Sequence, residues 1–382
     1  MPVEHAAIIG AGIAGLTAAL SLSSRGISSE IFEQAGELTE VGAGLQISPN
    51  ASHILAELGI LERLSDVWLE PEAIRLISGS SLRQLAAVPA GAFARARWGA
   101  PYGVLHRTTL QKTFLAAVEA DPLCRLHLGV RMESALPAFE RAPDVVIGAD
   151  GVWSKLRQFI PGSPSPRFSG NIAYRFTIAE AEAPRFLDRT SVCAFLGGAA
   201  HLVCYPLKET GSFNMVAITA GNVAPQAWQG EPTDVQRRQL HARLSGWNAA
   251  IVSLFEKRQG LTFWPLFETT SGAWQDGRSA VLIGDAAHAM MPFAAQGAAM
   301  AIEDAYELAA LLSNRPVAEA LTLFERQRTP RIDALRKRGA FNRFAYHAKG
   351  PIRIGRDLVL GLKPPQSLAT DLDWIYGYRA KL

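Results

Sequence analysis

The chain has 382 residues, of which 48% are hydrophobic and 19% are charged, and its formal net charge is +3. This balance can fill a large core and excludes a disordered chain, while the even scatter of Lys and Arg excludes the basic patch that nucleic-acid binding requires. The cysteines Cys124, Cys193 and Cys204 stand far apart in the sequence and lack metal-ligand spacing. They predict neither a disulfide framework nor a metal site, and they favour a reducing compartment.

The first residues predict a β-strand, a tight turn, a helix and a second β-strand. The apolar run 5–9 leads into a glycine-rich turn, residues 14–25 are rich in Ala and Leu and stop at a glycine, and a second strand over 28–32 closes on Glu33. This order is typical of a βαβ unit with parallel strands.

The apolar stretch 6–22 could be mistaken for a secretion signal or a membrane span. However, Glu4 rather than Lys or Arg precedes it, and three glycines interrupt it. It is also short for a segment that crosses a bilayer. We therefore expect no targeting segment, no membrane association and a cytoplasmic location.

The next elements alternate between helices and strands. The pattern predicts a helix over 51–58 that begins at Pro49-Asn50, and a hairpin with irregular segments but no helix between 75 and 98. A helix over 109–120 and a buried strand over 144–148 follow.

The second half begins with a β-rich region and ends in helices. Its predicted strands cover residues 173–178, 192–196, 202–205 and 213–219. They are followed by predicted helices over 233–244 and 249–256, a buried strand over 279–283 and an apolar helix over 297–312. The remainder is predicted to be mostly helical.

Gly10, Gly12 and Gly15 form the pattern G-x-G-x-x-G between the first strand and the first helix. In dinucleotide-binding turns the first glycine permits the turn, the second lets the backbone approach a pyrophosphate, and the third lets the helix pack on the strand. The phosphates then lie at the positive end of the helix. Glu33 stands where a carboxylate accepts hydrogen bonds from a ribose diol and repels a 2′-phosphate. The motif therefore predicts a dinucleotide site.

Two further acidic motifs follow predicted strands. One is DVVIGADG (144–151), which contains Asp150; the other is LIGDAAH (282–288), which contains Asp285 and continues into PFAAQG (292–297). Ligands of open parallel sheets lie at the carboxyl ends of the strands. Each motif alone could be a turn before a helix, but the three motifs in this order predict one shared site.

At these residues the sequence resembles the FAD-dependent aromatic hydroxylases, which are group A flavoprotein monooxygenases with the para-hydroxybenzoate hydroxylase fold, and within them the salicylate hydroxylase-like branch. The resemblance spans essentially the whole chain. It rests on the segments GAGIAG (10–15), FEQ (32–34), VGAGLQISPN (41–50), HRTTL (106–110), DVVIGADGVWSKLR (144–157), HLVCYPL (201–207), LIGDAAHAMMPFAAQGAAMAIEDA (282–305) and WIYGY (374–378).

The resemblance implies an α/β fold with a Rossmann-like FAD-binding domain of the GR2 type, an inserted β-sheet-rich substrate domain and a helical C-terminal region. The expected boundaries are 1–74, 100–171 and 266–340 for the FAD-binding domain, 75–99 and 172–265 for the substrate domain, and 341–382 for the C-terminal tail.

The resemblance also implies which residues hold FAD. The ADP half would lie along the glycine turn, and backbone N–H groups at the start of the helix over 297–312 would face the pyrimidine edge of the flavin. That edge carries negative charge when the flavin is reduced, so donors and a helix N-terminus suit it. Asp150 and Arg157 would close the site from the dinucleotide side. The residues expected to bind FAD are Gly10, Gly12, Ala14, Gly15, Glu33, Gln34, Gln46, Arg107, Val130, Asp150, Asp285, Gly297 and Ala298.

The implied activity is hydroxylation of a small hydroxylated aromatic or heteroaromatic acid, of the salicylate, hydroxybenzoate or hydroxynicotinate type, through a flavin C4a-hydroperoxide. FAD would carry this chemistry. NADH or NADPH would bind transiently, since the sequence has no second G-x-G-x-x-G, and O2 would be the other co-substrate. The resemblance also implies a homodimer. Two alternatives stay open, namely a flavin epoxidase or biosynthetic ring oxygenase of the same fold, and a flavin-binding protein without turnover.

The expected catalytic residues are His201, Tyr205 and Pro292. His201 and Tyr205 stand four apart on one predicted strand and therefore share a face, and an imidazole suits transfer of a phenol proton. Alternatively, His201 lies at the surface and Tyr205 packs in the core. Pro292 would flank the flavin where oxygen reacts. Some members of the family carry His in place of Gln46 and Phe293, so the identity of the base stays open.

Overall fold

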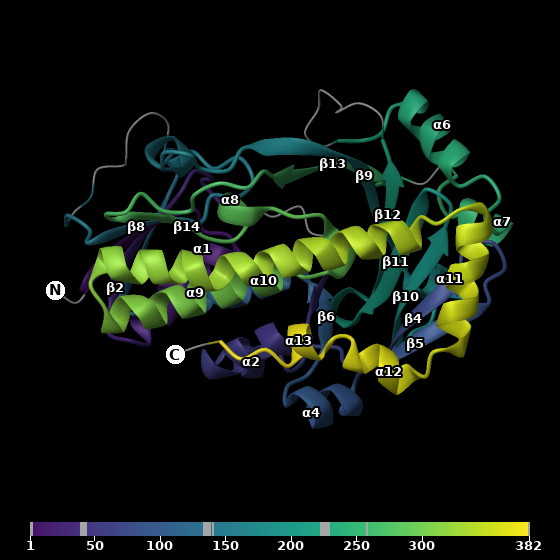
Figure 1. Ribbon diagram of the computed structural model, residues 1–382, viewed down its shortest axis with the longest axis horizontal. Helices are drawn as coiled ribbons and strands as arrows, with labels where there is room; N and C mark the ends of the chain where they lie inside the picture. The colour runs from purple at the N-terminus through teal and green to yellow at the C-terminus, as the bar shows by residue number, and fades with distance from the viewer. Residues whose placement is uncertain are drawn as a thin grey trace.

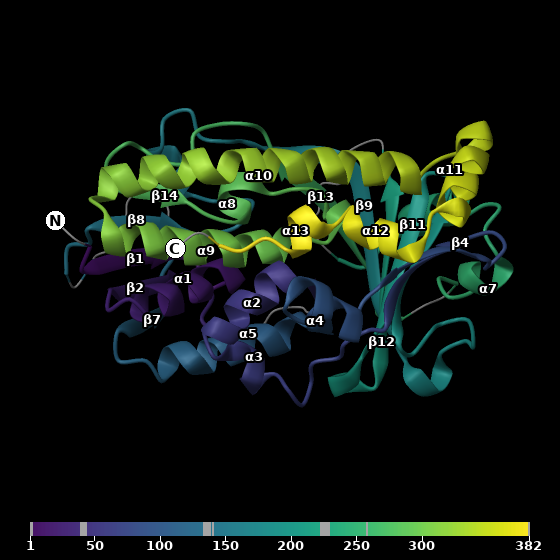
Figure 2. The same ribbon diagram turned by 60° about the horizontal axis from the view of Figure 1, so that its bottom comes forward.

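The computed structural model describes residues 3–38, 44–132, 139, 141–221, 230–256 and 259–380. Two main β-sheets lie at opposite ends of the molecule, a five-stranded parallel sheet and a seven-stranded mixed sheet (Figure 1; Figure 2). Helix α10 (Val317–Tyr346) runs along the length between them (Figure 1). A Rossmann-like sheet, a second sheet and C-terminal helices confirm the predicted fold class.

The parallel sheet has the strand order β14-β8-β1-β2-β7, and all neighbouring strands in it are parallel. Its strands are β1 (His5–Ile9), β2 (Ser28–Glu33), β7 (Cys124–Leu128), β8 (Val145–Gly148) and β14 (Ala280–Leu282). The four strands predicted here are confirmed to within one residue at each end. Strand β7 was not predicted, because its sequence CRLHL mixes charged and apolar residues at an edge of the sheet.

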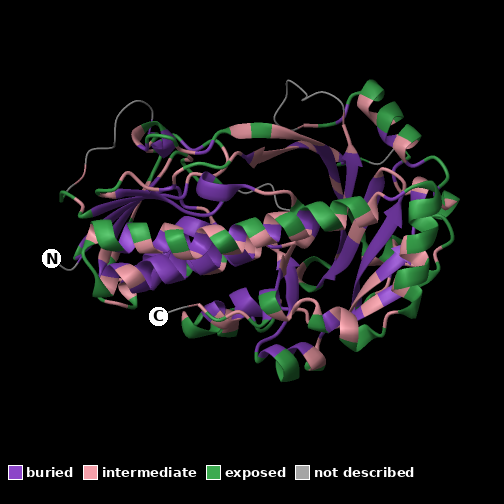
Figure 3. Cartoon of the chain, in the orientation of Figure 1, coloured by how far each residue is buried: buried purple, intermediate pink, exposed green. Residues whose placement is uncertain are grey.

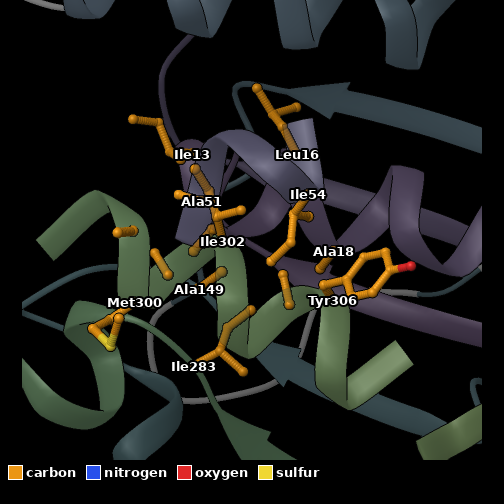
Figure 4. Close-up of a cluster of buried hydrophobic side chains, with 14 of the residues drawn as sticks. Ile13, Leu16, Ala18, Ala51, Ile54, Ala149, Ile283, Met300, Ile302 and Tyr306 are labelled. Carbon is orange, nitrogen blue, oxygen red and sulfur yellow. The ribbon is translucent and has the colours of Figure 1, made fainter. Parts of the chain in front are cut away.

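The helices predicted in the α/β part of the chain are also confirmed. They are α1 (Ile13–Ser23), α2 (Pro49–Glu57), α5 (Arg107–Glu119) and α9 (Gly297–Asn314). Helices α1, α2 and α9 share one apolar cluster, in which Leu16, Ile54 and Ile302 lie close together (Figure 4). The N-cap of α2 is Ser48 rather than the predicted Pro49-Asn50, because Pro at the first helical position already has the φ value of a helix.

The mixed sheet has the strand order β13-β9-β12-β11-β10-β4-β5. Its strands are β4 (Ala73–Ser78), β5 (Gln84–Pro89), β9 (Pro166–Ala179), β10 (Ser191–Gly197), β11 (Ala200–Leu207), β12 (Ser212–Ala220) and β13 (Thr262–Thr269). The four strands predicted between 172 and 220 are confirmed, and each is longer than predicted. Strand β13 was not predicted because Pro265 interrupts it; Pro is tolerated there since β13 is an edge strand.

The mixed sheet extends across two of the expected domain boundaries. Strand β9 begins at Pro166, before residue 172, and β13 continues to Thr269, past residue 265. The expected boundaries therefore remain predictions. Residues 133–138 and 140, between Gly129 and Asp144, lie outside the described residues, as do the first three residues of the segment 41–50.

The hairpin predicted between 75 and 98 is present as β4 and β5, but the prediction that no helix lies there is wrong. Helix α4 (Ala92–Trp98) stands between Gly91 and Gly99, whose φ values are +53° and +73°. Its Ala and Arg residues favour a helix, and the glycines bound that helix rather than marking a loop.

Helices cover the outer face of the mixed sheet and form the C-terminal region. The longer ones are α6 (Asp234–Arg243), α10 and α11 (Gly350–Leu362). Helix α7 ends at Val252, earlier than the predicted residue 256. The remaining elements are β3 (Gly44–Ile47), β6 (Gly103–His106), α3 (Ile60–Arg63), α7 (Ala249–Val252), α8 (Asp285–His288), α12 (Pro365–Thr370), α13 (Asp373–Tyr376), and the 3-10 helices η1 (Leu156–Phe159), η2 (Glu180–Glu182), η3 (Lys208–Thr210) and η4 (Pro292–Ala294). Within the described part of the chain, no helix has both the length and the apolar character needed to cross a membrane.

Burial is highest in the two sheets and in α9, whereas α10 alternates between buried and exposed positions and α11 is exposed or half-buried throughout (Figure 3). Two of the three cysteines meet in the mixed sheet. Cys193 and Cys204 are register partners on β10 and β11 although they stand apart in the sequence, and both are buried free thiols. Their hydrogen bond, together with burial, raises the pKa of Cys204.

A buried ionic cluster joins α9 to α10. The guanidinium of Arg328, which is 0% exposed, pairs with Glu303 at 2.8 Å, Asp304 at 2.7 Å and Glu307 at 3.3 Å. His288 lies 2.5 Å from Asp304 through Nε2, and the same carboxylate accepts the backbone N–H before α8. Although burial opposes it, the charges of His288 and Arg328 lower the pKa of Asp304 to about 2. The cluster therefore anchors the loop before α8, which contains the third motif, to both α9 and α10.

Candidate functional site

The glycine turn connects β1 to α1. Gly10 has a φ of +103°, and a Cβ atom there would lie 2.6 Å from the carbonyl oxygen of Ala149. A Cβ on Gly15 would lie 1.9 Å from the carbonyl oxygen of Gly10, so packing requires glycine at both positions. Gly12 is the N-cap of α1, has no side-chain cap among the described residues, and a Cβ there would meet nothing within 4 Å. The N-terminus of α1 therefore faces open space, as an anion site requires.

Glu33 lies beside this turn, as predicted. Its carboxylate accepts hydrogen bonds from the backbone N–H groups of Ala11 and Ala35, each at 2.9 Å, and its own carbonyl accepts one from Val130 N–H. Each carboxylate oxygen keeps a free lone pair for a further donor. Gln34 is exposed next to them. The structure thus brings Glu33, Gln34 and Val130 together at the end of β2.

The second and third motifs meet through Arg157. Its guanidinium donates to the carbonyl oxygens of Ala286, Asp285 and Val152, and makes no ion pair with Asp150 among the described contacts. Asp150 instead accepts the backbone N–H groups of residues 155 and 156 with Oδ2, while its buried Oδ1 has no described partner. Burial raises the pKa of Asp150. The side chain of Asp285 is exposed at the start of α8.

The third motif also contacts the glycine turn. A Cβ on Gly284, whose φ is +58°, would lie 3.3 Å from the Cβ of Ala14 on α1 and 3.2 Å from that of Ala301 on α9. The N-terminal halves of α1 and α9 therefore lie on either side of the loop before α8. This contact brings together the segments that are expected to lie along one dinucleotide.

The N-terminus of α9 is open. Its N-cap residue, Gln296, provides no cap in the described structure, because its side chain bonds instead to Ser48 at 2.9 Å and to Asn50 at 3.2 Å. Gly297 is exposed, and a Cβ there would meet nothing within 4 Å. The backbone N–H groups of Gly297 and Ala298 thus point out of the N-terminus of α9, which is the positive end of the helix dipole. The sequence reasoning missed Gln296, Ser48 and Asn50, although all three lie in the segments that it used.

Gln46 and Arg107 lie at the two-stranded ribbon of β3 and β6. The Oε1 atom of Gln46 accepts a hydrogen bond of 2.7 Å from the hydroxyl of Tyr102. Arg107 is the first residue of α5, directly after β6, and its charge acts on Arg175 of β9. The ribbon therefore lies between the α/β part and the mixed sheet.

His201 and Tyr205 share a face of β11, as predicted, but they contact different groups. His201 is 2% exposed, its Nδ1 lies 2.9 Å from Nε2 of His347, and its ring lies 5.0 Å from that of Phe293 in η4, next to the exposed Pro292. Burial and His347 lower the pKa of His201. The alternative that His201 lies at the surface is therefore wrong.

Tyr205 lies at the other end of β11 and is buried within the main hydrophobic cluster. The alternative that Tyr205 packs in the core is therefore confirmed. A Cβ on Gly44 would lie 2.5 Å from its ring, so Tyr205 packs tightly against β3. Burial raises the pKa of Tyr205. Its hydroxyl therefore stays protonated and is a hydrogen-bond donor at neutral pH.

The face of the mixed sheet opposite α6 and α7 has a half-buried stretch between these two residues, which we call the recess. Its floor is a row of half-buried register partners across four strands, namely Val203, Val216, Arg175 and Thr262. On one side His201 is covered by Phe293 of η4. On the other side Tyr205 and Asn214 are buried against Gly44 of β3, whose N–H donates to Asn214 at 2.9 Å. The recess thus lies between β3 and η4.

Sequence reasoning also missed Arg175, Asn214 and His347. The available signal for Arg175 was an arginine between apolar residues of a predicted strand, since charged residues are rarely buried. His347 stands far from the motifs and gave no signal, because only the fold brings the end of α10 to β11. Beside His347 the structure has a cavity of about 1050 Å³, lined by Phe293, Met291 and Arg336 among others.

Comparison with known proteins agrees with this geometry. Residues 4–338 match the family described as FAD binding domain. The chain is 34% identical to 3-hydroxybenzoate 6-hydroxylase 1 of Aquipseudomonas alcaligenes, over 97% of this chain and 96% of that protein. It is 31% identical to 6-hydroxynicotinate 3-monooxygenase of Bordetella bronchiseptica, over 87% and 89% of the two chains.

The fold is also found in solved structures. Klebsiella pneumoniae HpxO complexed with FAD and uric acid matches with a TM-score of 0.82 at 23% identity, over 97% of this chain and 95% of that one. A salicylate hydroxylase substrate complex matches with a TM-score of 0.79 at 23% identity, over 99% and 96% of the two chains. The chain therefore belongs to the FAD binding domain family, among its flavoprotein aromatic hydroxylases.

Proposed function

We propose that the chain is an FAD-dependent monooxygenase that consumes NADH or NADPH and O2 to hydroxylate a small hydroxylated aromatic or heteroaromatic acid. The observation that carries this proposal is the pair of uncapped helix N-termini, on α1 and α9, which lie either side of the loop before α8. One suits a pyrophosphate and the other an anionic flavin ring. Both named relatives at 31% identity or more act on ring acids, as their names state.

The residues present fit FAD. Gly12 leaves open space at the N-terminus of α1, and the carboxylate of Glu33 has lone pairs left for ribose hydroxyls. The backbone N–H groups of Gly297 and Ala298 would hold the pyrimidine edge. Gln46 and Pro292 would flank the ring from β3 and η4, while Asp150 and Asp285 would lie along the middle of the cofactor. Bound FAD supplies the reduction of O2 and the transfer of one oxygen atom to the substrate.

The chain's own residues would bind the substrate, exclude water and move a proton. The imidazole of His201 is neutral because burial disfavours its charged form, so it would take the proton of a ring hydroxyl only while giving its own ring proton to His347. Its hydrogen bond to His347 offers a path for that proton toward the neighbouring cavity. The Phe293 ring covers His201 and keeps water from it.

The paired histidines predict that stability falls in acid. Burial and the charges of Arg343 and Lys349 lower the pKa of His347 from 6.5 to about 4, and the pKa of His201 is also lowered. The unfolded chain therefore binds more protons than the folded chain below pH 6.5, and this contribution to stability is lost as pH falls from about 6.5 to about 4. Urea unfolding at a series of pH values should show this slope.

In that series His347→Gln should flatten the slope between pH 6.5 and 4. His241→Gln, on α6 and away from the pair, is the matched control and should leave the slope as in the wild type. An unchanged slope in His347→Gln would contradict the assignment of the histidine pair as neutral groups.

The proposed function is tested by oxidation of NADH and of NADPH with a panel of ring acids, including salicylate, 3-hydroxybenzoate, 4-hydroxybenzoate and 6-hydroxynicotinate, with identification of the products. We expect one acid to accelerate oxidation and to gain one hydroxyl group, and we expect the purified protein to carry FAD. Bound FAD that no acid helps to turn over would favour a flavin-binding protein without turnover. An oxidised alkene or a larger ring would favour an epoxidase or ring oxygenase.

We also propose a cytoplasmic location and a homodimer. The cysteine pattern, with the paired Cys193 and Cys204 as free thiols, suits a reducing compartment. Helix α11 supports the homodimer, because it exposes an apolar face that includes Ile354, Leu358 and Leu362, which are 67%, 62% and 75% exposed.

The homodimer proposal predicts that Leu358→Glu yields monomers, because the glutamate would be buried at the interface. Light scattering after size-exclusion chromatography would measure the mass of each species. Val235→Glu is the control, since Val235 is also an apolar residue at the surface, 53% exposed, but lies on α6 rather than on α11. A wild-type chain that is monomeric throughout, or a dimer that survives Leu358→Glu, would contradict this interface.

A further inference from the structure

Arg175 is a charged residue on the floor of the recess without a charged partner. Its guanidinium makes no ion pair or side-chain hydrogen bond with any of the described residues, and its Nε atom is buried without an acceptor. The ring of Trp264 lies 5.3 Å from it, on the neighbouring strand β13. An aromatic face offsets only part of the cost of removing a guanidinium from water.

The surroundings of Arg175 make that cost larger. Burial and the charge of Arg107 lower the pKa of Arg175, while Tyr205 opposes them. Asn214 lies at the same recess and is 1% exposed; its Oδ1 accepts the N–H of Gly44, but its Nδ2 is buried without an acceptor. The recess therefore has two unsatisfied donors, one of them positive, and no described acceptor faces them. Unsatisfied buried donors of this kind indicate a missing acceptor.

We propose that Arg175 binds the carboxylate of the aromatic substrate, with Nδ2 of Asn214 as a second donor. This inference rests on the proposed function and names a specificity-determining residue for it. A carboxylate matches the fork of a guanidinium and supplies the absent negative charge. The recess lies between β3 and η4, which carry Gln46 and Pro292, the residues proposed to flank the flavin.

The position of Arg175 also orients the ring of the substrate. With the carboxylate at β9, the ring extends over Val216 and Val203, which are its neighbours across β12 and β11. The rows through His201 and Tyr205 lie on either side of the ring. A ring hydroxyl can then reach the acceptor at His201 or the donor at Tyr205, depending on its position relative to the carboxylate.

The test is a binding titration of the FAD-loaded enzyme without NAD(P)H, followed by the change in flavin absorbance. The probes are salicylate, 3-hydroxybenzoate, 4-hydroxybenzoate and 6-hydroxynicotinate, each compared with its primary amide. We expect at least one acid to bind the wild type tenfold or more tighter than its amide. Arg175→Gln should weaken that acid at least 30-fold and its amide less than threefold, because only the acid loses a charge pair.

Arg175→Lys keeps the charge and should give an intermediate acid affinity, which also guards against a variant that fails to fold. Arg167→Gln is the matched control, since Arg167 lies on the same strand but is exposed and pairs with Glu268. Equal weakening of acid and amide in Arg175→Gln would overturn the proposal. It would also be overturned if the wild type bound none of the acids more tightly than the matching amide. Loss of FAD affinity with an unchanged acid-to-amide ratio would assign Arg175 to the flavin instead. Because binding is measured without turnover, these outcomes do not depend on whether hydroxylation is detected.

Discussion

Replacing Arg328 by methionine is expected to lower the free energy of unfolding by about 3–5 kcal/mol. Methionine fills much of the same volume but leaves the carboxylates of Glu303, Asp304 and Glu307 buried without their shared cation. Arg331 still pairs with Glu303 at 2.7 Å, but the Asp304 carboxylate would keep only His288 and one backbone N–H. Urea unfolding of both proteins, with the same FAD content, measures the difference.

The control for this variant is Arg326→Met on the same helix. Arg326 is exposed, so its replacement should change the free energy of unfolding by less than about 0.5 kcal/mol. A loss below about 1 kcal/mol in Arg328→Met would show that the cluster does not hold α9 to α10. Because His288 and Asp304 anchor the loop before α8, we also expect weaker FAD binding in Arg328→Met than in the control.

Replacing Gly297 by aspartate is expected to affect stability and catalysis in opposite directions. An acid in the first turn of α9 interacts favourably with the helix dipole and should leave stability unchanged or raise it by about 0.3–1 kcal/mol. The same charge would repel an anionic reduced flavin at this helix end. We expect the reduction potential of bound FAD to fall and substrate-dependent NAD(P)H oxidation to slow about tenfold or more.

Gly297→Ala is the matched variant for this comparison. A Cβ at this position meets nothing within 4 Å, so alanine should leave the fold intact and change the reduction potential little. An aspartate variant with the potential and rate of the alanine variant would contradict the placement of the flavin at α9. Potentiometric titration of both variants measures the effect directly.

The parts of the fold that could be predicted from the sequence are those with local causes. Gly15 is required by a close contact within one βαβ unit, Gly10 has a positive φ in the turn of that unit, and the buried strands of the parallel sheet are short apolar runs between turns. Strands β7 and β13 were missed because their place at sheet edges tolerates charged residues and a proline. Helix α4 was missed because its flanking glycines also occur in loops.

The recess could not be predicted in the same way. Arg175 and Asn214 acquire their positions from the register of β9 and β12, and His347 reaches His201 only because α10 ends beside β11. The side chain of Gln296 also depends on a contact with Ser48 that is distant in sequence. Such long-range contacts have no local pattern, whereas the glycine turn has one.

A crystal structure of the FAD-loaded chain would show directly where the cofactor binds. We expect one FAD per chain, with its pyrophosphate at the N-terminus of α1 beside Gly12, its ribose at Glu33, and the pyrimidine edge of its flavin at the N–H groups of Gly297 and Ala298. FAD bound elsewhere, or a flavin ring distant from the N-terminus of α9, would contradict it.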